Sequence, residues 1–200
     1  GGLHHLHLSG REPRLTEIYE GRIGDQQEID RLVGQVVADH DAELLLWFDN
    51  PPQTNEAGRS ASFMAGLLGL SGRPGPQFEL LEIGASAGIN TMMARYHYDL
   101  GCDQNPIDLT DDDTAARLKG YIWPEMPARF EKMEAAIALA RQEPPDLVRA
   151  DAADWVEEQL LVPQESRVTR VLMHSIVWQY LPQETKDRIT TALETAGKAA

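Results

Sequence analysis

The segment 82–88, with the sequence Glu-Ile-Gly-Ala-Ser-Ala-Gly, constrains the fold more than any other part of the chain. The apolar residues 78–81 before it predict a buried strand, because a run rich in Ser, Gly and Pro at 71–76 bounds them. Residues 89–96 after it contain no Gly or Pro and predict a helix. A turn of small residues between a strand and a helix directs backbone N–H groups at a ligand, and glycine lets the backbone approach it. The sequence therefore predicts an α/β protein with a ligand-binding turn.

Several chemistries use such a turn, and the spacing of its small residues separates them. The dinucleotide fingerprint G-x-G-x-x-G does not fit the spacing here. The nucleophile elbow of hydrolases, G-x-S-x-G, matches residues 84–88 literally. The S-adenosylmethionine (SAM) site of class I methyltransferases has an acid, an apolar residue and G-x-G-x-G, which segment 82–88 fits except for Ser86 at the middle glycine. A tight turn that binds nothing is the remaining interpretation.

Composition narrows the classes of partner. The chain has 200 residues, enough for one domain with a full core, and its 32 acidic against 18 basic residues give a net charge of −14. That charge argues against binding to nucleic-acid phosphates. No apolar run is long enough to span a membrane, so no membrane partner is expected. The single cysteine, Cys102, excludes an internal disulfide framework and fits a reducing cytoplasm. Nothing in the sequence indicates the oligomeric state.

The first third of the chain has helical patterns. Apolar residues recur at helical spacing over 25–48. His4, His5 and His7 have no carboxylate or Cys at ligand spacing nearby, so we expect exposed histidines on a helix face and no metal site.

A polar segment, residues 53–60, opens a second helix that runs to about Leu70. Two interpretations of it stay open: Thr54 or Asn55 caps the helix, or the polar side chains close over a bound ligand. The candidate substrate-binding or lid residues are Gln53, Thr54, Asn55, Glu56 and Arg59.

The remainder alternates between strands and helices. Residues 146–150 and 168–173 predict strands, a helix is expected over 153–161, and Pro182 opens a terminal helix. Such alternation is typical of a doubly wound, mostly parallel sheet, whose ligands lie beyond the carboxyl ends of the strands. Glu82, Asp151 and His174 all fall at such ends. We expect a helical N-terminal cap region over 1–72 and a sheet domain over 73–200.

The sequence pattern does not show the second strand that the expected sheet requires. A doubly wound fold needs a second strand between Tyr98 and Trp123, but residues 101–108 are too polar and too short to predict one. The chain also stops one helix after its last recognisable strand. We therefore expect that residues are absent near position 101 and after Ala200.

The chain is similar to a bacterial family known as domain of unknown function 2332, which resembles the class I SAM-dependent methyltransferases and their Rossmann-like fold. The similarity covers essentially the whole chain. The blocks that carry it are 3–11, Pro-Pro-Gln-Thr-Asn-Glu at 51–56, 81–90, Arg-Tyr-His-Tyr at 95–98, Asp-Gln-Asn-Pro-Ile-Asp at 103–108, Trp-Pro at 123–124, 149–155, and His-Ser-Ile-Val-Trp-Gln-Tyr-Leu-Pro at 174–182. The resemblance also implies extra residues before Cys102, in agreement with the gap expected there.

The resemblance implies a role for each residue of the site. Gly84, Ser86 and Gly88 would surround the methionine end of SAM, and Ala85 and Asn90 are further cofactor-binding candidates. Glu82 would lie near the amine of SAM, and Asp103, with Asp108 behind it, would hold the ribose hydroxyls. Asp151 and Ala152 would meet the adenine. His174 would face the reacting methyl group and remove a proton from the acceptor, or would be a buried histidine bonded to the backbone.

The function expected from this resemblance is methyl transfer from SAM to a small molecule or a protein. Two alternatives stay open. A module with the SAM fold could bind a ligand or partner without catalysis. A serine hydrolase would use Ser86, Asp151 and His174, which occur in the chain order of an α/β-hydrolase.

Overall fold

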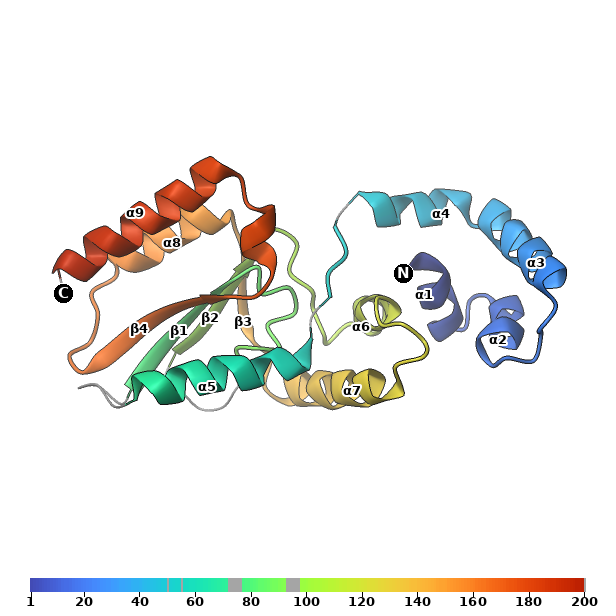
Figure 1. Cartoon of the computed structure of the whole chain (residues 1–200), viewed down its shortest axis with the longest axis horizontal. Coiled ribbons are helices and arrows are strands. Elements are labelled where there is room, and N and C mark those ends of the chain that lie inside the picture. The colour runs from blue at the N-terminus through green and yellow to red at the C-terminus, as the bar shows by residue number, and fades with distance from the viewer. Residues whose placement is uncertain (50, 55, 72–76, 93–97, 200) are drawn as a thin grey trace. The chain divides into compact units, whose positions relative to one another are not determined.

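The computed structural model describes residues 1–49, 51–54, 56–71, 77–92 and 98–199. The chain divides into two compact units (Figure 1). Residues 1–54 and 108–137 form a helical unit, and residues 55–107 and 138–200 form a unit built on a sheet. The helical unit therefore includes a second segment, 108–137, from the middle of the chain. The expected boundary at residue 72 would have assigned that segment to the sheet domain.

In the helical unit the first segment of the chain folds into short helices. They are α1 (Gly2–Leu8), α2 (Pro13–Tyr19), α3 (Gln26–Asp39), α4 (Asp41–Leu45) and the 3₁₀ turn η1 (Leu46–Phe48). The second segment adds α6 (Asp112–Gly120) and most of α7 (Pro127–Gln142). Leu6, Leu15 and Val36 are fully buried between α1, α2 and α3. The side chain of Asp25 caps α3 and that of Asp111 caps α6, so both helices begin where backbone N–H groups find an acceptor.

The histidines of α1 correct the expectation of an exposed helix face. His4 and His5 are buried, because α1 packs against α6 as well as α2. The His4 ring contacts those of Tyr19 and Phe130, and the His5 ring contacts that of Trp47. Burial lowers the pKa of both imidazoles. Within the described ranges, no group of three or more His, Cys, Asp or Glu side chains is arranged to hold a metal ion.

The second unit contains a four-stranded, all-parallel sheet with the order β3-β2-β1-β4. Its strands are β1 (Gln77–Ile83), β2 (Tyr98–Asp103), β3 (Asp146–Arg149) and β4 (Val168–His174). The strands expected over 78–83, 146–150 and 168–173 are confirmed, although β3 pairs with β2 and not with β1. The unit also contains the 3₁₀ turns η2 (Ala57–Arg59) and η3 (Val177–Tyr180) and the helices α5 (Ser60–Leu70), α8 (Ala152–Leu161) and α9 (Gln183–Ala199).

Helices cover both faces of the sheet (Figure 1). Leu81 and Ile83 of β1 pack with Trp155 and Val156 of α8 and Ile189 of α9. On the other face, Phe78 and Leu80 of β1 pack with Leu67 of α5 and Met173 of β4. Alternate residues of β1 thus point to opposite layers, as expected of a strand buried on both sides. Glu82, two residues after Leu80, therefore points to the layer of α5.

The expectation that residues 101–108 contain no strand is wrong for the part up to Asp103. β2 lies between β1 and β3 and forms hydrogen bonds to both, so pairing on two sides overrides its weak strand pattern. A side chain at Gly101 would meet Ala85 and Leu147 at 2.9 Å, which explains a glycine in this central strand.

The expected helix after the turn does not begin where the sequence predicted it. Residues 89–92 form turns, and positions 93–97 lie outside the described residues. The described ranges also contain no helix long and apolar enough to cross a membrane.

A nearly buried ion pair joins the adjacent strands β1 and β4. Arg170 of β4 donates from Nε and Nη2 to the carboxylate of Glu79 on β1, at 2.7 and 3.1 Å. The side chains are only 8% and 13% exposed. Arg170 Nη1 also donates to the backbone oxygens of Gln159 and Val162, so one guanidinium holds the end of α8 against the sheet.

We predict that Arg170→Met destabilises the protein by about 3 kcal/mol, because it leaves a buried carboxylate and two carbonyl oxygens without their donor. Urea denaturation would measure the loss. The matched control is Arg188→Met on α9, whose ion pairs are more exposed. We expect the control to lose much less stability. If both variants lose the same free energy of unfolding, the buried ion pair of Arg170 contributes no more to stability than the exposed ion pairs of Arg188.

Candidate functional site

The carboxyl ends of the strands bring most of the predicted site residues to one edge of the sheet. Glu82 near the end of β1 and Asp103 at the end of β2 lie on adjacent strands. Ile83 is level with His174 of β4, so His174 lies on the other side of β1. Asp151 also lies at the carboxyl end of its strand, β3. β3 and β4 are the two outer strands of the sheet, so Asp151 is three strand spacings from β4, or about 14 Å. The chain order reverses between β1 and β4, and in open parallel sheets ligands bind at such a switch point.

The turn after β1 has three residues with left-handed backbone. Gly84, Ser86 and Gly88 have φ of 65°, 56° and 67°. This conformation accounts for the spacing of small residues, because only glycine adopts it without strain. The protein itself fills the space beside both glycines. A side chain at Gly84 would meet Val177 at 2.6 Å, and one at Gly88 would meet Pro145 at 2.7 Å. A substitution such as Gly84→Val would therefore disturb the fold as well as any binding.

The carboxylate of Glu82 is the most unusual group at this edge. The residue is 1% exposed, and its Oε1 accepts a hydrogen bond from Asn90 Nδ2 at 3.0 Å. Within the described part of the chain Glu82 Oε2 has no hydrogen-bond partner, and neither have Asn90 Oδ1 and Ser86 Oγ, which are also buried. Burial raises the pKa of Glu82 to about 7, although Asn90 and the charge of Arg59 act in the opposite direction. Buried polar atoms without partners are rare in proteins and call for an explanation.

Asp103 holds the turn to the neighbouring strand. Its Oδ2 accepts from the backbone N–H of Ser86 at 2.9 Å, and its Oδ1 accepts from that of Asn105 at 2.8 Å. Asp108, expected behind it, bonds to Thr110 instead.

Asp151 is the N-cap of α8. Its Oδ1 accepts from the backbone N–H groups of Ala153 and Asp154 at 2.9 and 3.3 Å. Ala152 is buried as the first residue of the helix. The acid and small residue expected at the adenine thus also start a helix.

His174 is exposed, and its ring stacks on that of Trp178 with 5.1 Å between centroids. Partial desolvation in this stack lowers the pKa of its imidazole. The expected alternative, a buried histidine, is not what the structure shows. Ser86 Oγ lacks a hydrogen bond to any described residue, so Ser86 and His174 do not form the contact of a serine hydrolase.

The residues directly after His174 form a feature that the sequence did not predict. Ile176 has φ 70° and ψ −42°, and the N–H of Val177 donates to the oxygen of Ser175 at 2.8 Å. This is a γ-turn of the strained kind, and a β-branched residue in it is an outlier. Ser175 Oγ accepts a hydrogen bond from Arg59 Nη1 at 2.8 Å. Nothing in the local sequence pattern signals the strain at Ile176.

The polar segment before α5 is only partly described. Glu56 and Arg59 belong to the sheet unit, Gln53 and Thr54 belong to the helical unit, and Asn55 lies outside the described residues. Glu56 caps the turn η2 by accepting from the N–H of Gly58, and α5 begins later, at Ser60. Arg59 donates to Ser175, the residue that directly follows β4.

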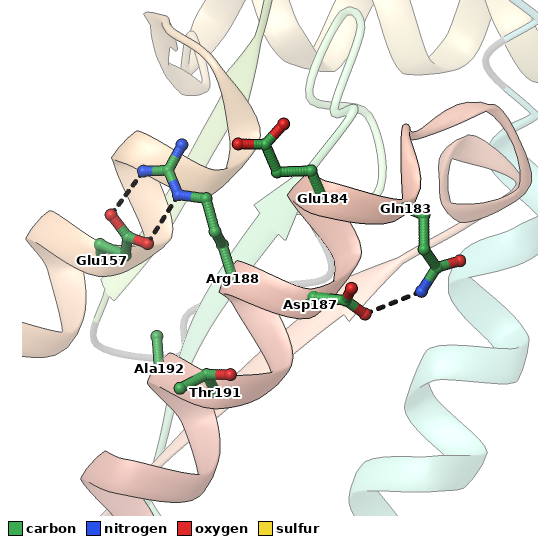
Figure 2. Close-up of a pocket in the computed structure, with 7 residues that line it drawn as sticks. All are labelled: Glu157, Gln183, Glu184, Asp187, Arg188, Thr191 and Ala192. Atoms are coloured by element: carbon green, nitrogen blue, oxygen red, sulfur yellow. Dashed lines mark hydrogen bonds and ion pairs between the residues drawn. The ribbon is translucent and has the colours of Figure 1, made fainter.

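A hollow on the paired helices α8 and α9 is a second place where a ligand could be sought (Figure 2). Most of its polar side chains bind to other side chains. Arg188 pairs with Glu157 and Asp154, and Gln183 donates to Asp187. Glu184, the remaining charged side chain there, is exposed to solvent, so the hollow does not call for a ligand as the buried Glu82 does.

The chain belongs to the bacterial family described as an uncharacterized protein conserved in bacteria, domain of unknown function 2332. The sequence model of that family matches residues 1–101 and 99–200. The two matched segments meet within β2, beside the place where the sequence predicts that residues are absent. No curated protein and no solved structure matches the chain.

We predict that Ser86→Gly stabilises the protein by about 1 kcal/mol, because glycine removes the strain of φ 56° and a buried hydroxyl with no hydrogen-bond partner among the described residues. Part of the gain is offset by the greater freedom of glycine in the unfolded chain. Ser86→Ala is the matched control, since it removes the hydroxyl and keeps the strain. Thermal unfolding would compare the three proteins, and a Gly variant no more stable than the Ala variant would contradict a strained backbone here.

The pKa of Glu82 predicts an unusual dependence of stability on pH. With a pKa of about 7 in the folded protein, raised above its ordinary value of 4.5, Glu82 holds its proton more tightly when folded. Its contribution to stability is therefore full below pH 4.5 and is lost as the pH rises through 7. We predict that Glu82→Gln is more stable than wild type at pH 8, by up to about 3 kcal/mol, and similar to it at pH 5.

Urea denaturation at the two pH values measures this difference. Glu194→Gln on the exposed side of α9 is the matched control, and we expect it to change the pH profile little. Parallel profiles for wild type and Glu82→Gln would rule out a raised pKa at this position.

Proposed function

We propose that this protein is a SAM-dependent methyltransferase whose cofactor lies along the carboxyl edge of the sheet. The observation that carries the proposal is the buried Glu82 carboxylate, one oxygen of which has no hydrogen-bond partner among the described residues, as is also true of Asn90 Oδ1 and Ser86 Oγ in the turn that follows. When Glu82 is ionised, two of these three atoms are acceptors only, and the hydroxyl can accept. A ligand that satisfies them must bring several N–H donors, and a positive charge favours the ionised carboxylate. A primary ammonium group, as in the methionine end of SAM, has both properties.

The order of the strands supports the same ligand. The order β3-β2-β1-β4 is that of the first four strands in the doubly wound dinucleotide fold. From the turn after β1, a long ligand can extend past Asp103 on β2 to Asp151 beyond β3. The ribose hydroxyls would then lie at the end of β2, where Asp103 is, and Asp151 has an acceptor oxygen beyond the one that caps α8.

The other side of β1 is then the reacting side. When bound, SAM supplies a methyl group already activated by its sulfonium, so the protein contributes mainly alignment and exclusion of water. His174 is exposed at the end of β4, and its lowered pKa keeps the imidazole neutral near pH 7. A neutral imidazole can accept a proton from an incoming nucleophile. The acceptor on this side is a small molecule or a protein side chain.

Calorimetric titration with SAM and with its demethylated product tests the proposal. We predict that both bind and that Glu82→Gln weakens each by about tenfold, since it removes a charged acceptor from a buried site. Because the ammonium needs the ionised carboxylate, wild-type affinity should rise between pH 6 and pH 8, across the pKa of about 7.

Glu194→Gln again serves as the control and should bind like wild type. Absence of binding at millimolar SAM would overturn the proposal. Binding that Glu82→Gln leaves unchanged would place the cofactor elsewhere, and binding without methyl transfer to any acceptor would favour a non-catalytic module.

A further inference from the structure

Arg59 differs from the well-paired arginines of the chain. Arg14, Arg170 and Arg188 each form ion pairs with carboxylates. Arg59 forms none with the residues that the structure describes, and instead donates from Nη1 to the hydroxyl of Ser175 at 2.8 Å. A guanidinium has five N–H donors in a rigid fork that matches a carboxylate. Arg59 is half-buried and lacks a described carboxylate partner although the chain has a net charge of −14. Its described hydrogen bond uses one of the two Nη groups.

Arg59 and Glu82 belong to the same site without touching. Glu82 points to the layer of α5, and Arg59 immediately precedes α5. The positive charge of Arg59 acts on Glu82 and lowers the pKa of its carboxyl against the effect of burial. The two groups form no ion pair with each other, since the described contact of the Glu82 carboxylate is with Asn90 and that of Arg59 is with Ser175. The buried Glu82 carboxylate and the Arg59 guanidinium, which has no carboxylate partner among the described residues, thus belong to the same end of the sheet.

The partner of Arg59 is held by the strained turn. Ser175 accepts the N–H of Val177 across Ile176, and Val177 packs against Gly84. The γ-turn therefore places the Ser175 hydroxyl at the level of the ligand-binding turn. Strained backbone that persists next to a functional edge is a common means of positioning a group.

We propose that Arg59 binds the carboxylate of an α-amino-acid group whose ammonium lies at Glu82, and that Ser175 positions the guanidinium for it. This inference rests on the proposed function, because the amino-acid group is that of the methionine end of SAM. The ligand is recognised as a zwitterion: the negative Glu82 meets its ammonium, and the positive Arg59 meets its carboxylate. The bidentate fork of Arg59 makes the carboxylate a requirement for tight binding.

The test compares SAM with decarboxylated SAM, which keeps the ammonium and loses the carboxylate. By calorimetry, wild type should bind SAM about tenfold more tightly than the decarboxylated analogue. Arg59→Gln should lose this preference by binding SAM about tenfold more weakly and the analogue as wild type does. Arg59→Lys keeps the charge without the fork and should keep part of the preference. Ser175→Ala should weaken SAM binding a few-fold and leave the analogue unaffected.

Arg167→Gln is the matched control, because it removes one arginine at the start of β4, the opposite edge of the sheet. It should keep the wild-type preference, and thermal unfolding should show that all variants are folded. A wild type that binds both ligands equally, or an Arg59→Gln variant that keeps the preference, overturns this inference and leaves the proposed function standing. A wild type that binds neither ligand overturns both.

Discussion

The Asp103 carboxylate organises the carboxyl edge of the sheet. It accepts the N–H of Ser86 from the turn after β1 and the N–H of Asn105 from the segment after β2. Backbone hydrogen bonds join the same strand ends. The N–H of Ala85 donates to the oxygen of Cys102, and the N–H of Ala150 donates to the backbone oxygen of Asp103. Three successive strand ends are thereby joined into one surface. The position of Glu82 relative to its neighbours depends on this junction, because the turn that carries Asn90 has no helix in its described part to hold it.

Much of the sheet unit could be predicted because its signals are local. β1, β4 and the helices α8 and α9 have apolar patterns of the right period, bounded by Gly and Pro. β2 could not be predicted in the same way, since Asp99, Gly101 and Asp103 interrupt its pattern and its strand form depends on partners from both sides. The turn at 89–92 is similar: the N–H and hydroxyl of Thr91 both bond to the oxygen of Gly88, and such local bonds compete with a helix. The burial of His4 and His5 depends on α6, more than 100 residues later in the chain.

In the candidate site, too, the local sequence pattern predicts the positions of the residues but not their contacts. The positions of Glu82, Asp103 and His174 at strand ends follow from the alternation of strands and helices. The state of these groups does not follow from it. Whether Glu82 Oε2 finds a donor, and whether Arg59 meets an acid or a serine, is decided by residues far apart in the sequence, with Ser175 more than 100 positions after Arg59. Ile176 adopts its strained conformation directly before Val177, which packs against Gly84, and no local pattern encodes it.

The packing around the two glycines of the turn changes how an alignment of this family should be interpreted. Val177 and Pro145 occupy the space beside Gly84 and Gly88, so natural selection for a folded protein is sufficient to keep both glycines. Their conservation in a relative would therefore be no evidence that the relative binds a ligand. Glu82 and Asn90 carry that information, because a buried carboxylate without a ligand is a burden to the fold. A lineage that has lost the ligand should replace Glu82 by a neutral residue and keep its glycines.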